Sequence, residues 1–405
     1  MSNDFQGLAS AAYNLKIWYQ GPLVDQINED VPIYRGAAKS SFKYEGSQVN
    51  RPLRTVRNPG IGATSDGGTL PKIGRQSGQQ AVIQAKYNYL RFGITGPMLK
   101  AAMTGGKGAF VAQAAHELKM GYEDLKNDEN RQCSWDGTGD LALLNAAVVA
   151  SNSMVVKGRE SGEEALKFLD VGMVVDIYNG TTQVASGIEI TAISSGNASS
   201  STATLTLDQN ITVSEDDIVV RSGSYGYEVQ GLLTQLDGAT STVFSLDRTT
   251  PSLQGNVVDL SAGQLTIDSL EQLWNQCQRR GGGKLSAIFS DYASLRMYKK
   301  LLTPDKRYVN TVKGDGGFAR KDENYAEYNG IPFVPDKDCP QRIFMLPQEY
   351  IEKMILCEME FADESGSMYI PQTSADSFEV RVRHFFNLFN AKASASGVLT
   401  NYVSP

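Results

Sequence analysis

The sequence predicts an α+β protein that combines a long two-stranded ribbon, one long amphipathic helix and a separate small all-β module. Residues 41–95 alternate like paired strands, residues 110–132 carry apolar side chains at helical spacing, and residues 161–228 hold short strands between turns. A chain of 405 residues is also too long for one ordinary core. We therefore expect several packed units and a long excursion.

The first 95 residues are predicted to form an arm and then the ribbon. Residues 1–40 mix apolar anchors with Gly and Pro without a sustained period, which is typical of an arm that packs on another surface. The ribbon runs out over Phe42–Arg57, turns in a glycine-rich tip over Pro59–Gly78, and returns over Gln79–Ile94. An isolated two-stranded ribbon is marginal in water, so it has to lie on a neighbour.

The return strand has a clear alternation. One predicted face holds Ala81, Ile83, Ala85, Tyr87 and Tyr89, and the other holds Gln80, Gln84, Lys86 and Asn88. This is the period of a half-exposed strand.

Charge is distributed unevenly between this excursion and the rest of the chain. Residues 41–95 hold eight basic residues against two acidic ones, a local balance of +6 within a chain of net charge −7. The remainder, at −13, is correspondingly acidic. The predicted inter-subunit contacts are basic residues of the ribbon and acidic residues of the helix: Arg51, Arg54, Arg57, Lys72 and Arg75, with Glu117, Glu123 and Asp124. Asp128 and Glu129 belong to the same acidic helix surface. Alternatively, the arginines only keep an exposed hairpin soluble.

The rest of the chain divides into four predicted parts. Residues 96–160 hold the helix Phe110–Gln132, and residues 161–228 form the inserted β module. Residues 229–345 look α/β, and residues 346–405 end in strands that return to the first unit. Within the α/β part, a helix begins near Asp268 with a capping box to Glu271 and ends at Gly281–Gly283, and a second helix covers Tyr292–Leu302.

No catalytic, cofactor-binding or metal-binding residues are predicted. No catalytic-triad sequence motif surrounds either of the two histidines, His116 and His384. The Gly-Lys runs at 105–107 and 281–284 lack the residue spacing of a phosphate-binding loop. The carboxylates at 124–129 and 215–217 lack calcium-loop spacing and are interpreted as solvated charge. The four cysteines form no CxxC pair and are interpreted as reduced, mostly buried thiols.

Composition excludes further classes of protein. With a net charge of −7, the chain lacks the excess of basic residues that is expected of a protein that binds nucleic acid directly. No apolar run approaches the roughly 18 residues of a membrane span, and the N-terminus lacks signal-peptide regions, so we expect a protein made and kept in a cytosol.

Two short sequence segments and the order of the predicted parts resemble those of the major capsid protein of tailed bacteriophages, which has the Hong Kong 97 fold. Residues Tyr328–Val334 followed by Ile343–Leu346 are similar to its late axial-domain passage, and Phe378–Arg383 leading to Gly397–Asn401 is similar to its closing strands. The resemblance covers nearly the whole chain. It implies an N-arm, an E-loop hairpin, a spine helix, and peripheral and axial domains; the β module departs from the minimal fold.

The resemblance implies a structural protein rather than an enzyme. Copies would self-assemble as pentamers and hexamers into an icosahedral shell that encloses double-stranded DNA without sequence-specific binding. Expected partners are a separate scaffolding protein and a portal, with the protein located in the virion after assembly in the host cytoplasm. Two alternatives stay open, namely an encapsulin-type compartment with the same fold and a soluble hydrolase with an unrecognised site.

Overall fold

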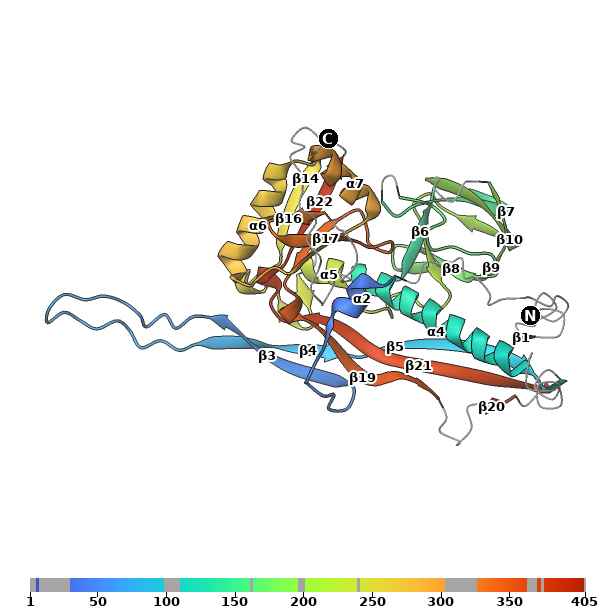
Figure 1. The fold of residues 1–405 in the computed structure, drawn as a ribbon, viewed down its shortest axis with the longest axis horizontal. Helices are drawn as coiled ribbons and strands as arrows, with labels where there is room; N and C mark the ends of the chain where they lie inside the picture. Colours follow the sequence, from blue (N-terminus) through green and yellow to red (C-terminus); the bar gives the residue numbers. More distant parts are fainter. Residues whose placement is uncertain are drawn as a thin grey trace.

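The computed structural model describes residues 5–6, 30–97, 110–160, 163–195, 201–238, 241–302, 326–362, 370–372 and 375–403; for 5–6, 110–118 and 194–195 it describes the backbone alone. The chain forms four parts: a projecting hairpin, a long sheet with a helix along it, a β-barrel, and an α/β unit (Figure 1). The expected arm at 1–40 lies largely outside the described residues.

The strands and helices have the following bounds. The strands are β1 (Phe5–Gln6), β2 (Ala38–Lys39), β3 (Gln48–Val56), β4 (Ser77–Gln84), β5 (Lys86–Thr95), β6 (Asp140–Leu144), β7 (Val148–Lys157), β8 (Val174–Asn179), β9 (Thr182–Ser195), β10 (Thr202–Val213), β11 (Ile218–Arg221), β12 (Thr242–Val243), β13 (Leu246–Asp247), β14 (Asn256–Gln264), β15 (Ala287–Ser290), β16 (Glu327–Tyr328), β17 (Ile331–Pro335), β18 (Ile343–Leu346), β19 (Ile351–Phe361), β20 (Ile370–Pro371), β21 (Ser377–Asn390) and β22 (Gly397–Val403). The helices are α2 (Pro32–Gly36), α4 (Phe110–Ser134), α5 (Leu232–Leu236), α6 (Ile267–Gly281) and α7 (Tyr292–Leu301), with short 3-10 turns at Pro251–Leu253, Gln348–Tyr350 and Ala393–Ala395.

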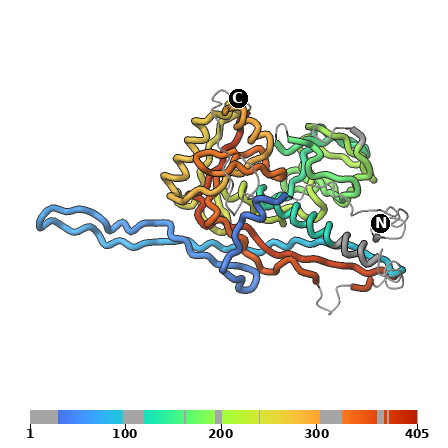
Figure 2. Tube along the Cα trace, in the orientation of Figure 1, coloured from blue at the N-terminus to red at the C-terminus, as the bar shows by residue number. Residues whose placement is uncertain are grey.

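The long sheet has the strand order β1-β5-β21-β19-β2, with β20 added beside β21. Strands β5 and β21 pair antiparallel over their whole shared length, although nearly 300 residues separate them along the chain (Figure 2). The helix α4 runs along this sheet, so that Tyr122 meets Phe361 edge to face with ring centroids 5.9 Å apart. The predicted helix Phe110–Gln132 is thus confirmed within two residues.

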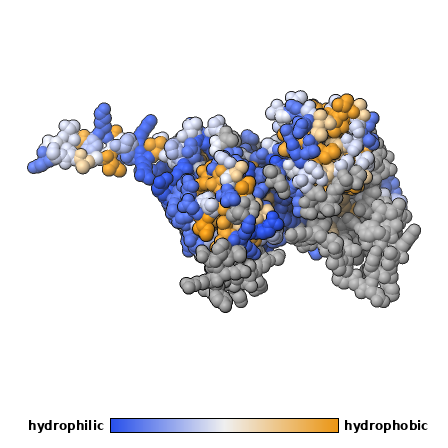
Figure 3. All heavy atoms as spheres, turned by 90° about the horizontal axis from the view of Figure 1, so that it is seen from above, coloured by the Kyte–Doolittle hydropathy of each residue, from blue (hydrophilic) through white to orange (hydrophobic). Residues whose placement is uncertain are grey.

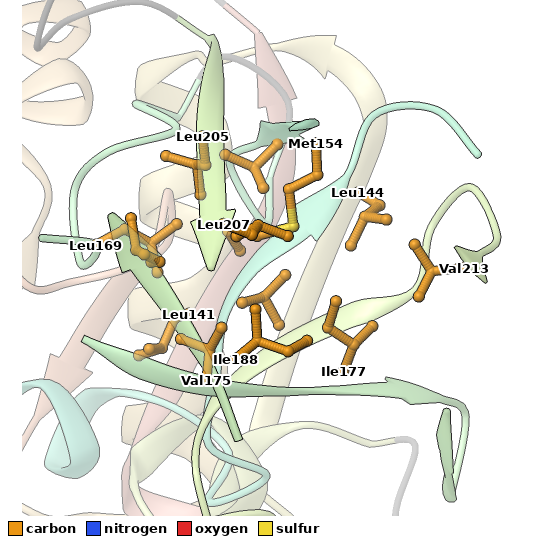
Figure 4. Close-up of a cluster of buried hydrophobic side chains, with 14 of the residues drawn as sticks. Leu141, Leu144, Met154, Leu169, Val175, Ile177, Ile188, Leu205, Leu207 and Val213 are labelled. Atoms are coloured by element: carbon orange, nitrogen blue, oxygen red, sulfur yellow. The ribbon is translucent and has the colours of Figure 1, made fainter. Parts of the chain in front are cut away.

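The β module is a closed barrel with the strand order β10-β7-β6-β11-β8-β9. Its interior is filled by aliphatic side chains such as Leu144, Met154, Ile188 and Leu205, none of which reaches solvent (Figure 4). Fully burying one such side chain contributes about 1.5–3 kcal/mol, which makes the barrel a core of its own. The barrel begins at β6 rather than at residue 161, because the apolar run from Leu141 supplies two of its strands.

The α/β unit has one sheet of order β14-β22-β18-β15-β17-β16, flanked by α6 and α7. The predicted start of its first helix was wrong by two residues: Thr266, not Asp268, is the N-cap, and Ser269 completes the capping box. The Thr266 hydroxyl accepts from the Ser269 amide at 3.1 Å, and the Ser269 hydroxyl accepts in return at 3.2 Å. Gly282 ends the helix with a left-handed φ of 61°, as the glycine run predicts.

The last 60 residues are divided between two sheets. Strands β19 and β21 lie in the long sheet beside β5, whereas β22 pairs with β14 and β18 in the α/β unit. The range 346–405 was expected to return as a whole to the first unit. Strand β22 differs because its apolar residues Val398 and Leu399 pack among the core residues of the α/β sheet.

The predicted return strand of the ribbon is two strands in two sheets. Strand β4 pairs with β3 as far as Gln84, and β5 pairs with β21 from Lys86 onward. The burial pattern shifts at this break: Ala81 and Ile83 are buried, but Tyr87 and Tyr89 are 51% and 57% exposed. The single predicted face of five residues is therefore wrong beyond Ala85, because the two strands pack against different neighbours.

Two further findings bear on the classes considered above. No helix among the described residues is long and apolar enough to cross a membrane. The four cysteines are free, and Cys133, Cys277 and Cys339 are buried.

Candidate assembly interface

The hairpin, defined as residues 48–84, contacts the rest of the described chain through its base, as far out as Thr55, whose carbonyl accepts from the Ser252 hydroxyl at 3.0 Å. Val49, Ala81 and Ile83 are buried there against residues of β12, β13 and β21. The Val82 amide donates to the Phe244 carbonyl at 2.9 Å, and the Asp247 amide donates to the Gln79 side chain at 2.9 Å. Beyond this base the hairpin projects away from the other three parts (Figure 1).

Arg51 belongs to the fastened base. Both of its terminal nitrogens donate to the Glu352 carboxylate at 3.1 Å, and its guanidinium lies 4.0 Å from the centroid of the Phe42 ring. A bidentate pair of this kind fixes the direction of the hairpin relative to β19. Arg51 is thus engaged within its own chain, and its predicted contact with a neighbouring subunit stays a prediction.

The four other predicted basic residues lie further out. Arg54 lies in β3, which stays paired with β4 as far as Val56, and Arg57, Lys72 and Arg75 belong to the hairpin tip, defined as residues 57–76. All four side chains are exposed, and none has an ion pair or hydrogen bond within the part of the chain that the structure describes. They are available to an acidic or anionic partner.

The tip holds its narrow shape through glycine. A Cβ on Gly60 would lie 2.7 Å from the Gly74 nitrogen, and a Cβ on Gly74 would lie 2.4 Å from the Gly60 nitrogen. The two backbones therefore approach more closely than any other residue type allows. The Gly60 amide donates to the Asn58 side chain at 2.8 Å, which begins the turn.

The hairpin tip also exposes three large aliphatic side chains that the sequence reasoning missed. Ile61 and Leu70 are 85% and 78% exposed, and Ile73 is fully exposed. Apolar and hydrophilic residues are interspersed along the projecting hairpin in Figure 3. Their exposure could have been predicted from the sequence, because these aliphatic residues lie in a segment that is too rich in Gly and Pro to form a core around them. Three exposed aliphatics on one narrow loop indicate a surface that another surface covers.

The predicted acidic surface of α4 is only partly exposed. The side chain of Glu117 lies outside the described residues. Glu123 is largely buried and lies 3.7 Å from Lys119, whereas Asp124 is exposed and lines a cleft of about 470 Å³ between α4 and the barrel. The interpretation of the cluster at 124–129 as solvated charge was wrong for Asp128 and Glu129, which bind partners inside the molecule.

The long sheet carries a second apolar surface, on the face turned away from α4. Tyr87 and Tyr89 of β5 meet Phe385 of β21 edge to face, with ring centroids 4.9 and 5.3 Å apart. The residues that alternate with them, Asn88 and His384, instead point toward Glu129 of α4. We call Tyr87, Tyr89 and Phe385 the aromatic face; its two tyrosines remain about half exposed.

A pair of substitutions separates the base of the hairpin from its tip. We expect Arg51→Ala to lower the free energy of unfolding by about 1.5–3 kcal/mol, because it leaves the largely buried Glu352 carboxylate without its charged donor. Arg57→Ala should change stability by less than about 0.5 kcal/mol, since this side chain is exposed and has no ion pair or hydrogen bond among the described residues. Urea denaturation of the full-length chain measures both. Equal losses for the two variants would contradict this assignment of Arg51.

The described residues also bear on metal chemistry. They contain no group of three or more His, Cys, Asp or Glu side chains that could hold a metal ion. The features that remain are surfaces: the projecting tip, its base and the aromatic face.

Comparison with solved structures identifies the fold. The chain is similar to the capsid asymmetric unit of cyanophage A-1(L), with 13% identity, 95% of this chain and 96% of that chain covered, and a TM-score of 0.59. It is also similar to the capsid of a native GTA particle, with 9% identity, coverage of 98% and 99%, and a TM-score of 0.52. The holo-SrpI encapsulin complex of Synechococcus elongatus PCC 7942 matches at 8% identity, with coverage of 98% and 96% and a TM-score of 0.50.

Sequence comparison does not extend this finding. No protein-family model matches the chain, and no curated protein matches it in sequence. The expected resemblance to the tailed-phage capsid fold is confirmed at the level of the fold. Each of these alignments covers nearly the whole of this chain and of the matched chain, so the barrel does not prevent recognition of the shared fold.

Proposed function

We propose that this chain, which has the fold of capsid and encapsulin subunits, is a major capsid protein that assembles with copies of itself into an icosahedral shell around double-stranded DNA. Pentamers and hexamers are the units of assembly. The α/β units meet at the ring centres, and each hairpin reaches over an adjacent subunit. The protein acts structurally and carries no active site of its own.

The observation that carries this proposal is the uncovered hairpin tip. Ile61, Leu70 and Ile73 have no core to enter among the described residues of their own chain, because the tip projects beyond the body. A second copy supplies the missing cover, since identical subunits place the same tip and the same receiving surface beside each other in every ring. The aromatic face is an uncovered apolar surface available to receive it.

The basic residues of the hairpin support the same arrangement. Arg54, Arg57, Lys72 and Arg75 flank the apolar residues and would set the register on acidic side chains of the neighbour. Exposed ion pairs contribute only about 0–1 kcal/mol each, so burial of the aliphatic residues supplies most of the binding energy. Repetition over many interfaces makes the shell stable.

Purification followed by electron microscopy and light scattering tests the proposal. We expect closed shells, or rings of five and six subunits, formed either alone or after co-expression with a separate scaffolding protein. A chain that stays monomeric at low and physiological salt, with and without scaffolding protein, would overturn it. The shell would assemble in the host cytoplasm, and the protein would then be located in the virion. In the complete shell, a portal would replace one ring.

An encapsulin-type compartment is the second candidate, favoured by the similarity to the Synechococcus encapsulin over nearly the full length of both chains. Both candidates form shells, so the contents decide between them. Nuclease-protected double-stranded DNA in purified particles supports the capsid. A co-purifying enzyme released only when the shell is opened supports the compartment.

A further inference from the structure

The end of α4 buries five consecutive polar residues. We call Asp128–Gln132 the polar turn. Glu129 and Asn130 are 0% exposed, Arg131 and Gln132 are 2% and 3% exposed, and Asp128 keeps 15% of its side chain exposed. Five residues cover more than one helical turn and so point in every direction. The helix end is therefore enclosed on all sides by other parts of the molecule.

The side chains of the polar turn reach several parts of the structure, and Arg131 and Gln132 share the segment at Glu228 and Val229. Asp128 lies 3.3 Å from Arg221 of the barrel, and Arg131 pairs with Glu228 in the segment that leaves the barrel. Glu129 lies 2.7 Å from the ring of His384 in the long sheet.

Asn130 connects the polar turn with helix α2 and with the α/β unit. Its Oδ1 accepts from the Tyr34 amide of α2 at 3.0 Å. Its Nδ2 donates to both carboxylate oxygens of Asp336 at 3.0 Å and to Asp338 at 2.8 Å, in the loop that follows β17 of the α/β unit. One turn of helix thus joins the barrel, the long sheet, the N-terminal helix and the α/β unit.

The charges around Asp336 are unbalanced. Lys167 of the barrel segment, Lys337 and Arg131 are the nearby cations; the nearby carboxyl groups are Asp338 and Asp291 at the start of α7, and the Cys133 and Cys339 thiols also lie close by. Two further carboxylates of the joint, Glu129 and Glu228, each keep a buried oxygen without a hydrogen-bond partner among the described residues, as does the Arg131 Nη1 nitrogen. Unpaired buried polar atoms weaken the folded joint when the carboxylates are charged.

We propose that the polar turn is a proton-controlled joint, which holds the barrel, the long sheet, α2 and the α/β unit rigidly when the carboxyl groups of Asp336, Asp338 and Glu129 are neutral and loosens when they ionise. A joint made of hydrogen bonds can exchange partners without opening an apolar core, which suits it to reorienting the barrel and the α/β unit. This inference concerns the single chain and stands apart from the proposed shell.

The direction of the pH dependence follows from burial. Burial, followed by the charge of Asp338, raises the pKa of Asp336 to about 7, and burial likewise raises the pKa of Glu129 and Asp338. Groups with a raised folded-state pKa bind protons more tightly when folded, so their contribution is full below the ordinary carboxyl pKa and is lost as pH rises toward about 7.

Asp128 does not oppose this trend between pH 5 and pH 8. Burial raises its pKa, but Arg131 and Arg221 outweigh burial and lower the pKa to about 2. Asp128 therefore stays ionised throughout that range, in both the folded and the open state.

Amide hydrogen exchange of the full-length chain at pH 5 and pH 8 tests the joint. After correction for intrinsic exchange rates, we expect peptides covering 128–134, 336–341 and 384–390 to exchange about tenfold faster or more at pH 8, a factor that corresponds to one unit of pKa difference. Peptides from the barrel core around Leu205 should keep the same protection. All three junction peptides should respond together, because they share one turn of helix.

Variants decide whether the carboxyl groups cause the effect. Asp336→Asn keeps an acceptor for Asn130 and removes the titration, so most of the pH-dependent acceleration should disappear, whereas the exposed Glu215→Gln should leave it unchanged. If Asp336→Asn does not fold, Glu129→Gln serves the same purpose. Unchanged junction protection between pH 5 and pH 8 in the wild type would overturn the proposal, as would full acceleration in folded Asp336→Asn.

Discussion

Replacing the three exposed aliphatic residues of the hairpin tip by aspartate should abolish assembly while the free chain stays folded. The variant is Ile61→Asp, Leu70→Asp and Ile73→Asp together. Fully burying one aliphatic side chain contributes about 1.5–3 kcal/mol, so removing three weakens each tip contact by at least about 4 kcal/mol, roughly a thousandfold in its equilibrium constant. Since every subunit of a ring repeats the same contact, the loss applies to each interface and closed particles should disappear.

A matched variant separates apolar burial from charge. Ala63→Asp, Thr69→Asp and Gln76→Asp place the same three negative charges at exposed positions of the same tip without removing a large apolar side chain. We expect this control to assemble, and added salt to favour its assembly, because the tip changes from net positive to net negative and salt screens its repulsion from an acidic neighbour. Light scattering and electron microscopy measure assembly, and thermal unfolding of the unassembled chain checks the fold. Loss of assembly in both variants would assign the interface to charge rather than to the aliphatic residues.

Glu228→Ala should destabilise the folded chain more than any surface substitution. Arg131 and Glu228 form an ion pair with side chains only 3% and 6% exposed, and removing one partner leaves a buried charge that Asp128 balances only in part. Breaking a buried pair in this way costs about 3–5 kcal/mol. Denaturant unfolding measures the loss at equal protein concentration, because assembly would add to the apparent stability.

The exposed pair Lys39–Glu358 provides the control for this prediction. Its side chains are 63% and 57% exposed, so Glu358→Ala should change the free energy of unfolding by about 0–1 kcal/mol. Glu228→Ala as mild as Glu358→Ala would show that the end of α4 relaxes around the missing partner. Such a result would place the rigidity of the polar turn in its contacts with Asp336 and His384 instead.

Local patterns predicted the three longest helices of the described chain and several of the strands. The strand Ile343–Leu346, the end of α6 at its glycine run and the extent of α4 agree with the structure, because periodicity and capping depend on neighbours within a few residues. The order of these elements also indicated the capsid fold, which structural comparison supports where sequence comparison found no match.

The candidate interface was predictable in position but not in character. The sequence placed the ribbon and its basic residues, yet it treated five arginines and lysines alike. The structure separates Arg51, which binds Glu352 from the far end of the chain, from Arg57 and Lys72, which are free among the described residues. A partner 301 residues away leaves no trace in local spacing.

By itself, the sequence determined what depends on short range: the helices and strands, the exposed glycine-rich tip and the segregation of basic charge in the hairpin. Tertiary structure alone decided which charges are buried and where a strand changes sheets. From the sequence, the carboxylates at 124–129 were interpreted as solvated, whereas the structure encloses Asp128 and Glu129 beside Arg221 and His384. The return strand over Gln79–Ile94 was predicted to be continuous, whereas its second half pairs with β21. The reason is physical: burial is a property of the chains packed around a residue, and those neighbours come from distant parts of the sequence.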